Sequence, residues 1–328
     1  MIKLYILFWI NLILSVDLSV SHSIGSVVSA LSIDFNDISS NKSDIRKLKK
    51  LKCKNTFKPL PDSVSETSGL IFFNNLWWTI NDSGGQPCLY SIDPKSGTVN
   101  NYITISNSTN VDWEEITQDS LSIYIGDFGN NNGNRKNLVI YKINKNHFSN
   151  ETNQMIPAEK IYFEYSDQLS FETRKFDNDY DCEAMVYFKD SLYLFSKNWI
   201  NHKTRIYRLP KNPGKYKAEL IDSIDTGFLI TGATISSDYK HLLLIGYRKG
   251  IKINNSFLWH IREFNGTKFS NGDRKKYRLK LKLSQTEAIC FKVNEVYFTR
   301  EVLTKYITIK QAMFKLNTKT LFDYPNAK

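Results

Sequence analysis

The chain has 328 residues, of which 13% are aromatic, and its formal net charge is +11 at pH 7. Its lysines are scattered, with dense runs only at 49–54 and 274–282, so the charge indicates a solvated surface and we expect no nucleic-acid partner. Clusters of Val, Ile, Tyr and Phe alternate with Asn, Asp and Gly turns, a pattern that predicts a β protein.

The first residues predict a secretory signal peptide over 1–22. Lys3 is followed by the apolar run Leu4–Leu14 and then by small polar residues. The run is shorter than the roughly 20 apolar residues of a membrane-spanning helix, and no later segment is long and apolar enough to span a bilayer. The protein is therefore expected to be secreted, in the periplasm or outside the cell, with no membrane span.

Residues 23–52 predict a flexible linker, because a Ser-, Asn- and Asp-rich piece is followed by a basic run. The folded domain is expected over 53–328. The four cysteines, Cys53, Cys88, Cys182 and Cys290, have no metal-binding CxxC spacing. In an exported protein they allow one or two disulfides, whose pairing the sequence leaves open.

One pattern occurs five times after this linker. A small polar residue or a glutamate opens an apolar strand, and a second, a third and a more polar fourth strand follow. The repeats begin about 55 residues apart, which suits four-stranded antiparallel sheets, at Ser68, Glu114, Glu183, Gly232 and Glu287. The sequence therefore predicts an all-β protein, a five-bladed β-propeller.

The fifth unit lacks a fourth strand of its own. Residues Cys53–Leu60 precede the first unit and can supply it, so the ring is expected to be closed by an N-terminal strand. A solenoid is disfavoured, because its repeats are usually shorter and need capping ends. A sixth, degenerate blade remains open in the long stretch Asn144–Tyr180.

The start of each first strand faces the axis of a propeller. Three glutamates there repel one another, since unit charges ~4 Å apart cost about 4 kcal/mol even at an effective dielectric constant of about 20. Calcium would neutralise them, because it accepts about six to eight oxygen ligands in flexible geometry. The expected ligands are Ser68, Glu114, Glu183, Thr231 and Glu287, with Thr231 one of several oxygen sources beside Gly232. Alternatively, the glutamates accept hydrogen bonds from backbone amides of neighbouring strands.

The second strands end on the same face and carry charges of both signs. We expect Asn81, Lys197, Arg248 and Arg300 to bind a small anionic ligand beside the cation, and Asp82 or Asp127 to orient a water as general base. The alternative is that these are loop charges paired with one another. The five histidines have no zinc spacing and are assigned no role.

The repeat starts resemble those of the calcium-dependent soluble apyrases, five-bladed propellers that hydrolyse nucleoside di- and triphosphates. That family holds a central calcium with Ser, Glu, Glu, Ser and Glu in blade order, and here Gly232 departs from the pattern while the other four positions match. The run Asn81-Asp82-Ser83-Gly84-Gly85 also lacks the arginine of the family's Asp-Asp-Arg-Thr-Gly motif, and no acidic motif precedes Ser68. In its Ser-Gly-Leu, Asn-Asp-Ser-Gly-Gly and Gly-Asp-Phe-Gly-Asn-Asn runs the chain is similar to uncharacterised secreted propellers of Bacteroidetes type.

Three functions follow from this pattern. The first is a secreted, monomeric calcium-binding propeller that binds an anionic ligand on its central face. The second is a calcium-dependent phosphoanhydride hydrolase, which the apyrase resemblance implies. The third is a surface module that binds an extracellular partner and uses its metal only for structure.

Overall fold

The computed structural model describes residues 47–57, 59–149, 151–248, 255–281, 284–304 and 308–322. The signal peptide expected over 1–22, and the linker as far as residue 46, lie outside these residues. Residues Lys49–Lys328 form one compact unit, and the regular secondary structure of its described residues is almost entirely β-strand. No helix among the described residues is long and apolar enough to cross a membrane.

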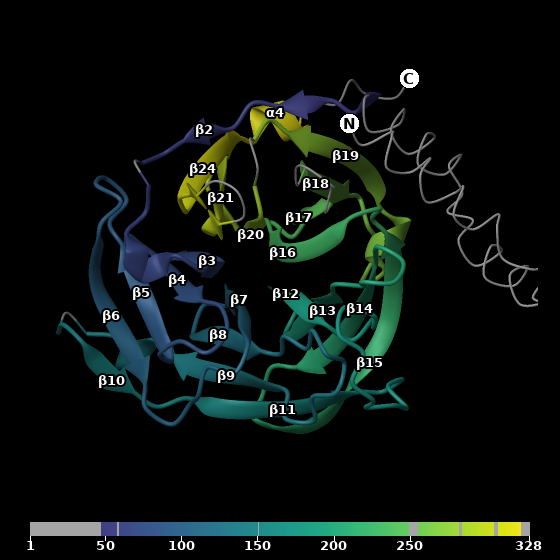
Figure 1. Cartoon of the computed structure of the whole chain (residues 1–328), viewed down its shortest axis with the longest axis horizontal. Helices are drawn as coiled ribbons and strands as arrows, with labels where there is room; N and C mark the ends of the chain where they lie inside the picture. Colours follow the sequence, from purple (N-terminus) through teal and green to yellow (C-terminus); the bar gives the residue numbers. More distant parts are fainter. Residues whose placement is uncertain are drawn as a thin grey trace, which may run out of the picture. The chain divides into compact units, whose positions relative to one another are not determined.

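The unit is a ring of five antiparallel blades, which confirms the predicted fold (Figure 1). The innermost strands lie next to one another around the axis and are β3 (Thr67–Phe73), β7 (Trp113–Gln118), β12 (Cys182–Phe188), β16 (Leu229–Ile235) and β20 (Thr286–Lys292). The second strands are β4 (Leu76–Asn81), β8 (Ser122–Asp127), β13 (Ser191–Ser196), β17 (His241–Arg248) and β21 (Glu295–Arg300).

Two further strands complete each blade. The third strands are β5 (Cys88–Ile92), β9 (Val139–Asn144), β14 (Lys203–Pro210), β18 (Asn255–Arg262) and β24 (Ala312–Asn317). The outer strands are β6 (Val99–Ile105), β11 (Glu159–Tyr165), β15 (Gly214–Asp225), β19 (Asp273–Leu279) and, in the fifth blade, β2 (Lys54–Asn55). Because β2 pairs antiparallel with β24, the N-terminal segment closes the ring as expected.

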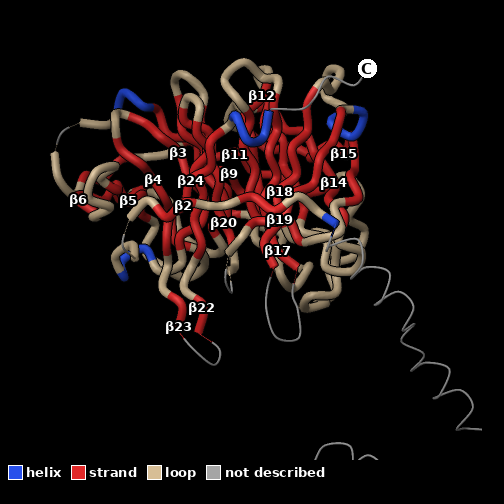
Figure 2. Tube along the Cα trace, turned by 90° about the horizontal axis from the view of Figure 1, so that it is seen from above, coloured by secondary structure: helices blue, strands red, loops and turns tan. Residues whose placement is uncertain are grey.

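Additional strands extend the outer edges. The strand β1 (Lys50–Leu51) pairs parallel with β19, so the expected linker ends before residue 50. The stretch Asn144–Tyr180 contains no sixth blade among its described residues: β10 (Gln154–Ile156) adds to β6, and β11 belongs to the second blade. A parallel pairing of β11 with β15 also joins the second and third blades edge to edge. The ribbon of β22 (Leu303–Thr304) and β23 (Thr308–Ile309) projects beyond one end of the ring (Figure 2).

The hydrophobic core lies between the blades rather than on the axis. Alternating apolar residues of each strand face the neighbouring blade. Trp113 of the second blade packs with Ile71 and Trp78 of the first, and Trp77 packs with Ala288 and Met313 of the fifth. These tryptophans therefore hold blades together. The four cysteines are free thiols, and Cys88, Cys182 and Cys290 are buried.

Candidate metal centre

The inner strands all begin at one end of the ring, which we call the carboxylate mouth. Four of them have a register shift at their second or third residue, which leaves Glu114, Glu183, Thr231 and Glu287 without a partner on the second strand. A β-bulge of this kind re-aims a side chain. In β3 the unpaired residue is Gly69, and Ser68 next to it occupies the equivalent place.

The register corrects the repeat in the fourth blade. The sequence comparison placed Gly232 at the start of that repeat, but Gly232 pairs with Ile245 and corresponds to Ala184 and Ala288. Thr231 is the residue at the ring position. The fourth blade therefore contributes the hydroxyl of Thr231 at the ring position, where Gly232 would have contributed no side chain.

The two hydroxyl groups of the ring connect neighbouring blades. Ser68 Oγ donates to the backbone carbonyl of Glu114, and Thr231 Oγ1 donates to that of Thr286. Both side chains are buried. They join the first blade to the second and the fourth to the fifth.

A second layer of side chains comes from the residues that follow the second strands. The backbone N–H groups of Asp82, Lys197 and Glu301 donate to the carbonyls of Glu66, Asp181 and Gln285, which precede the inner strands. This shared geometry turns the three side chains toward the mouth, where they influence one another's pKa. Tyr247 occupies the corresponding position in the fourth blade and lies near Lys197 and Glu287.

Arg248 and Arg300 lie next to this layer but not in it. Successive residues of a strand point to opposite faces, so Arg300 and Glu301 diverge. Arg300 donates from Nε to the carbonyl of Lys310, and its guanidinium lies 5.2 Å from the centre of the Phe314 ring. The charge of Arg248 acts on His202 and Lys276. Arg300 therefore points toward Lys310 and Phe314 instead of the central carboxylates.

Asp127 and Asn81 form hydrogen bonds with the backbone of loops next to the carboxylate mouth. Asp127 Oδ1 accepts from Arg135 Nη2 at 2.8 Å and from the backbone N–H of Asp112 at 3.1 Å, and Oδ2 accepts from Val111 N–H at 3.4 Å. Both carboxylate oxygens of Asp127 are thus engaged in positioning the loop that carries Asp112. Asn81 Nδ2 donates to the carbonyl of Ser63 at 2.8 Å.

Three carboxylates converge between the first and second blades. One oxygen each of Asp82, Asp112 and Glu114 lies within 4.8 Å of the other two. Two oxygens that each lie ~2.4 Å from one calcium ion are at most ~4.8 Å apart, so this spacing suits a shared ion. Gly129 lines the same space: a Cβ there would overlap the carboxylate oxygens of Glu114 and Asp112.

The charges at the mouth are almost all negative. Burial, followed by neighbouring carboxylates, raises the pKa of Asp112 to about 7. Burial also raises the pKa of each of these carboxyl groups: Asp82, Glu114, Asp181, Glu183, Glu287 and Glu301. Neighbouring carboxylates add to the shift in Asp82, Glu114, Glu183, Glu287 and Glu301. Raised pKa values of this kind are typical of buried carboxyl groups that have too little positive charge near them.

Lys197 lies among these carboxylates, while Arg135 acts on Asp112 from its ion pair with Asp127. Lys197 Nζ donates to Glu183 Oε1 at 2.7 Å, and both side chains are buried. Burial opposes the ammonium, but Glu183 and further carboxylates hold its pKa well above the usual range. One lysine cannot balance the group. In addition, Glu287 Oε1 is buried with no hydrogen-bond partner among the described residues.

Glu115 closes the axis behind the mouth. Its Oε1 accepts from Ile116 N–H at 2.9 Å and its Oε2 from Ala233 N–H at 3.1 Å. Burial raises its pKa, while these N–H groups and those of Met185 and Leu70 work against the shift. The backbone amides of the inner strands thus bind Glu115, which lies next to the ring position Glu114.

The sequence analysis did not single out Asp112, Glu115 or Glu301. A signal existed for Asp112, because it stands two residues before Glu114, as Glu66 does before Ser68 and Asp181 before Glu183. The sequence analysis selected Arg300 instead of Glu301, because the sequence does not determine which of these two consecutive side chains faces the axis. Glu115 gave no signal beyond its place beside Glu114.

Comparisons with known proteins support the fold. No family model matches the chain, and no curated protein matches it. Among solved structures, it is similar to an exo-β-1,3-galactanase from Phanerochaete chrysosporium, with a TM-score of 0.51 and 10% identity over 82% of this chain and 65% of that one. At this identity the likeness concerns the propeller architecture alone.

Two further solved structures are less similar. An α-L-arabinofuranosidase from Podospora anserina has a TM-score of 0.45 and 9% identity, and covers 82% of this chain and 96% of its own. A candidate exported protein from Bacteroides fragilis has a TM-score of 0.38 and 11% identity, over 82% and 99% of the two chains.

Proposed function

We propose that this protein is a calcium-binding β-propeller, exported from the cell, whose bound ion receives an anionic ligand at the carboxylate mouth. The observation that carries the proposal is the convergence of Asp82, Asp112 and Glu114, whose oxygens lie within 4.8 Å of one another. In the described part of the chain this group contains only oxygen donors, and hard oxygen donors favour calcium or magnesium over zinc.

Two observations outside the triad agree with a bound cation. The carboxylate of Glu287 is buried with an unpartnered oxygen, and its pKa is raised by burial and by other acids of the mouth. Gly129 keeps free the space in front of Glu114 and Asp112 that any other residue would fill. A divalent ion would compensate the charges that Lys197 leaves unbalanced.

The role of each expected residue follows from its contacts. Glu114 is proposed as a direct ligand, joined by Asp82 and Asp112. Glu183 is held by Lys197 and Glu287 lies nearby, so both act as part of the surrounding negative field. Ser68 and Thr231 hold the inner strands at the spacing that the ring requires. Asp127 positions Asp112 instead of activating water.

The anionic ligand is a consequence of the ion. Without it, the excess of carboxylates would repel an anion. Three carboxylates do not fill a coordination shell of about six to eight oxygens, so a bound calcium retains positions for phosphate or carboxylate oxygens. Lys197 is the side chain in the mouth that would contact such a ligand.

Titration calorimetry of the full chain, stripped with EGTA, tests the metal site. We expect saturable calcium binding that Asp82→Asn weakens by about tenfold or more, since each 1.4 kcal/mol of lost interaction is a factor of about ten. Glu172→Gln is a matched control, because Glu172 is exposed and its ion pair among the described residues is with Arg174 on its own loop. Absence of calcium binding to the unmodified chain would remove the proposal.

The same sample separates the remaining functions. With calcium present, we would add phosphate, then nucleoside di- and triphosphates, and measure both binding and phosphate release. Calcium-dependent release supports the hydrolase, and binding without release supports the ligand-binding propeller. Calcium binding with neither result leaves the ion a structural role in an interaction module.

A further inference from the structure

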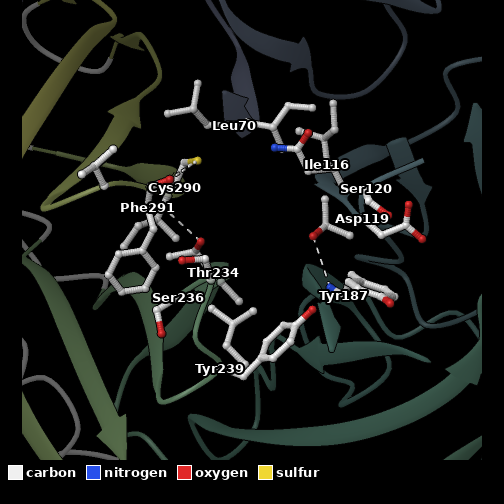
Figure 3. Close-up of a pocket in the computed structure, with 18 residues that line it drawn as sticks. Leu70, Ile116, Asp119, Ser120, Tyr187, Thr234, Ser236, Tyr239, Cys290 and Phe291 are labelled. Atoms are coloured by element: carbon white, nitrogen blue, oxygen red, sulfur yellow. Dashed lines mark hydrogen bonds between the residues drawn. The ribbon is translucent and has the colours of Figure 1, made fainter. Parts of the chain in front are cut away.

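The opposite end of the ring contains a cavity of about 410 Å³. We call it the hairpin mouth, because the inner strands turn there into the second strands. Its wall is formed by the last residues of the inner strands and by their turns (Figure 3). Glu115, bound to the amides of Ile116 and Ala233, lies between this cavity and the carboxylate mouth. The two ends are therefore separate sites.

The hairpin mouth carries no uncompensated charge among its described lining residues. Its one carboxylate is Asp119, whose Oδ1 accepts from the backbone N–H groups of Leu121 and Ser122 at 2.8 and 2.7 Å. Its Oδ2 accepts from Tyr124 at 2.9 Å and from Lys211 at 3.1 Å. Since every lone pair faces a donor, the cavity favours an uncharged ligand.

Hydroxyl groups of the inner strands face into the cavity. Thr117 Oγ1 accepts from the backbone N–H of Tyr187 at 3.2 Å. Thr234 Oγ1 accepts from the backbone N–H of Phe291 at 3.3 Å (Figure 3). A hydroxyl that accepts one hydrogen bond still has its own O–H to donate. Gln118 uses Nε2 on the carbonyl of Phe72 and keeps its Oε1 as an acceptor. The wall thus offers fixed donors and an acceptor.

The rim adds apolar surface that is exposed. Tyr239 is 38% exposed and lies near Tyr187, with which it shares one side of the opening (Figure 3). Val293, on the turn after β20, is 88% exposed and has a φ of 54°. A β-branched residue in this left-handed conformation is a true outlier, and strained residues cluster at ligand sites. A ligand in the cavity would cover both side chains.

We propose that the hairpin mouth binds an uncharged saccharide of one or two rings, with Thr117 and Thr234 hydrogen-bonded to its hydroxyls and Tyr239 against its C–H face. The volume lies at the small end of the roughly 300–1,000 Å³ found for small-molecule sites. A sugar ring combines a hydroxyl edge with an apolar face, which matches threonines below an aromatic rim. This site is independent of the calcium at the other mouth.

Saturation-transfer NMR on the full chain tests the proposal. The probes are glucose, galactose, mannose, xylose, arabinose, cellobiose and lactose, with glucuronate as the charged counterpart. We expect transfer to at least one neutral sugar and none to glucuronate. Tyr239→Ala should weaken binding about tenfold or more, which corresponds to about 1.4 kcal/mol. Tyr239 and Val293 both lie on exposed turns, so Tyr239→Ala and Val293→Gly are expected to fold.

Val293→Gly separates binding from stability. Glycine adopts a positive φ without strain, so this variant should melt at a higher temperature while it binds the sugar less tightly. Asp112→Asn and EGTA, which act at the carboxylate mouth, should leave sugar binding unchanged. The proposal fails if none of the seven neutral sugars binds, if binding survives Tyr239→Ala, if glucuronate binds equally well, or if EGTA abolishes binding.

Discussion

Replacing Asp112 with asparagine should change the stability in opposite directions with and without calcium. Asp112 has a pKa of about 7 against a usual value of 3.8. One pKa unit corresponds to about 1.36 kcal/mol, so at about pH 8 an ionised Asp112 destabilises the folded state by roughly 4 kcal/mol. Because the carboxylate is partly exposed, solvent screening reduces this cost to about half. Asparagine has a similar shape and carries no charge, so it removes this cost.

The melting temperature translates this free energy into a measurement. For a unit of this size, each kcal/mol shifts the melting temperature by roughly 2 °C, so Asp112→Asn in EGTA should melt about 4 °C or more above the unmodified chain. With calcium in excess the order should reverse, because the variant has lost a charged ligand and gains less stabilisation from binding. Scanning calorimetry or fluorimetry in both conditions measures this crossing.

The pH dependence of the same site has a fixed sign. A carboxyl with a raised pKa destabilises the folded state as pH rises through that value, so without calcium the unmodified chain should lose stability between about pH 4 and 7 through Asp112. Calcium must displace the proton, and its affinity should therefore increase with pH up to about 7. A variant that melts lower in EGTA, or that keeps the full calcium shift, would contradict the reasoning. Glu172→Gln should change neither quantity.

Three further predictions concern single residues. Gly129→Ala should abolish most calcium binding in calorimetry while the far-UV circular dichroism stays unchanged, because its Cβ overlaps the oxygens of Glu114 and Asp112. Glu115→Gln should lower the free energy of unfolding in urea by about 2–3 kcal/mol, with or without EGTA, because an amide replaces one oxygen that accepts from backbone N–H groups; an unchanged midpoint would refute its role. Burial, then His241, lowers the pKa of His260 to about 4, so the chain should lose about 3 kcal/mol through this group as pH falls from about 6.5 to 4. Urea titrations of His260→Asn should lack this component, and parallel curves for the two proteins would exclude it.

The architecture followed from local pattern. Strands such as Glu183–Tyr187 and Leu192–Phe195 were visible because a turn separates two apolar runs, and each was found in place as β12 and β13. The closure by residues near Lys54 followed from a missing strand in the last repeat. The repeat alone was enough to predict the strands and the closing segment, without knowledge of which distant residues are in contact.

The candidate site was predicted in part. The ring positions Glu114, Glu183 and Glu287 face a common mouth, as the repeat implied. Direction along the second strands was not predictable, because one residue of shift moves a side chain to the other face. That is why Arg300 was chosen and Glu301 was not.

The sequence by itself determined the β class, the number of blades and the closing strand, because periodicity and turn residues are local properties that repeat. Only the tertiary structure decided which acids meet. A bulge at Glu114, a loop held by Asp127 and the bare backbone of Gly129 bring Asp112 and Asp82 together from different blades. Such convergence depends on the rotation between blades, which no stretch of sequence encodes alone.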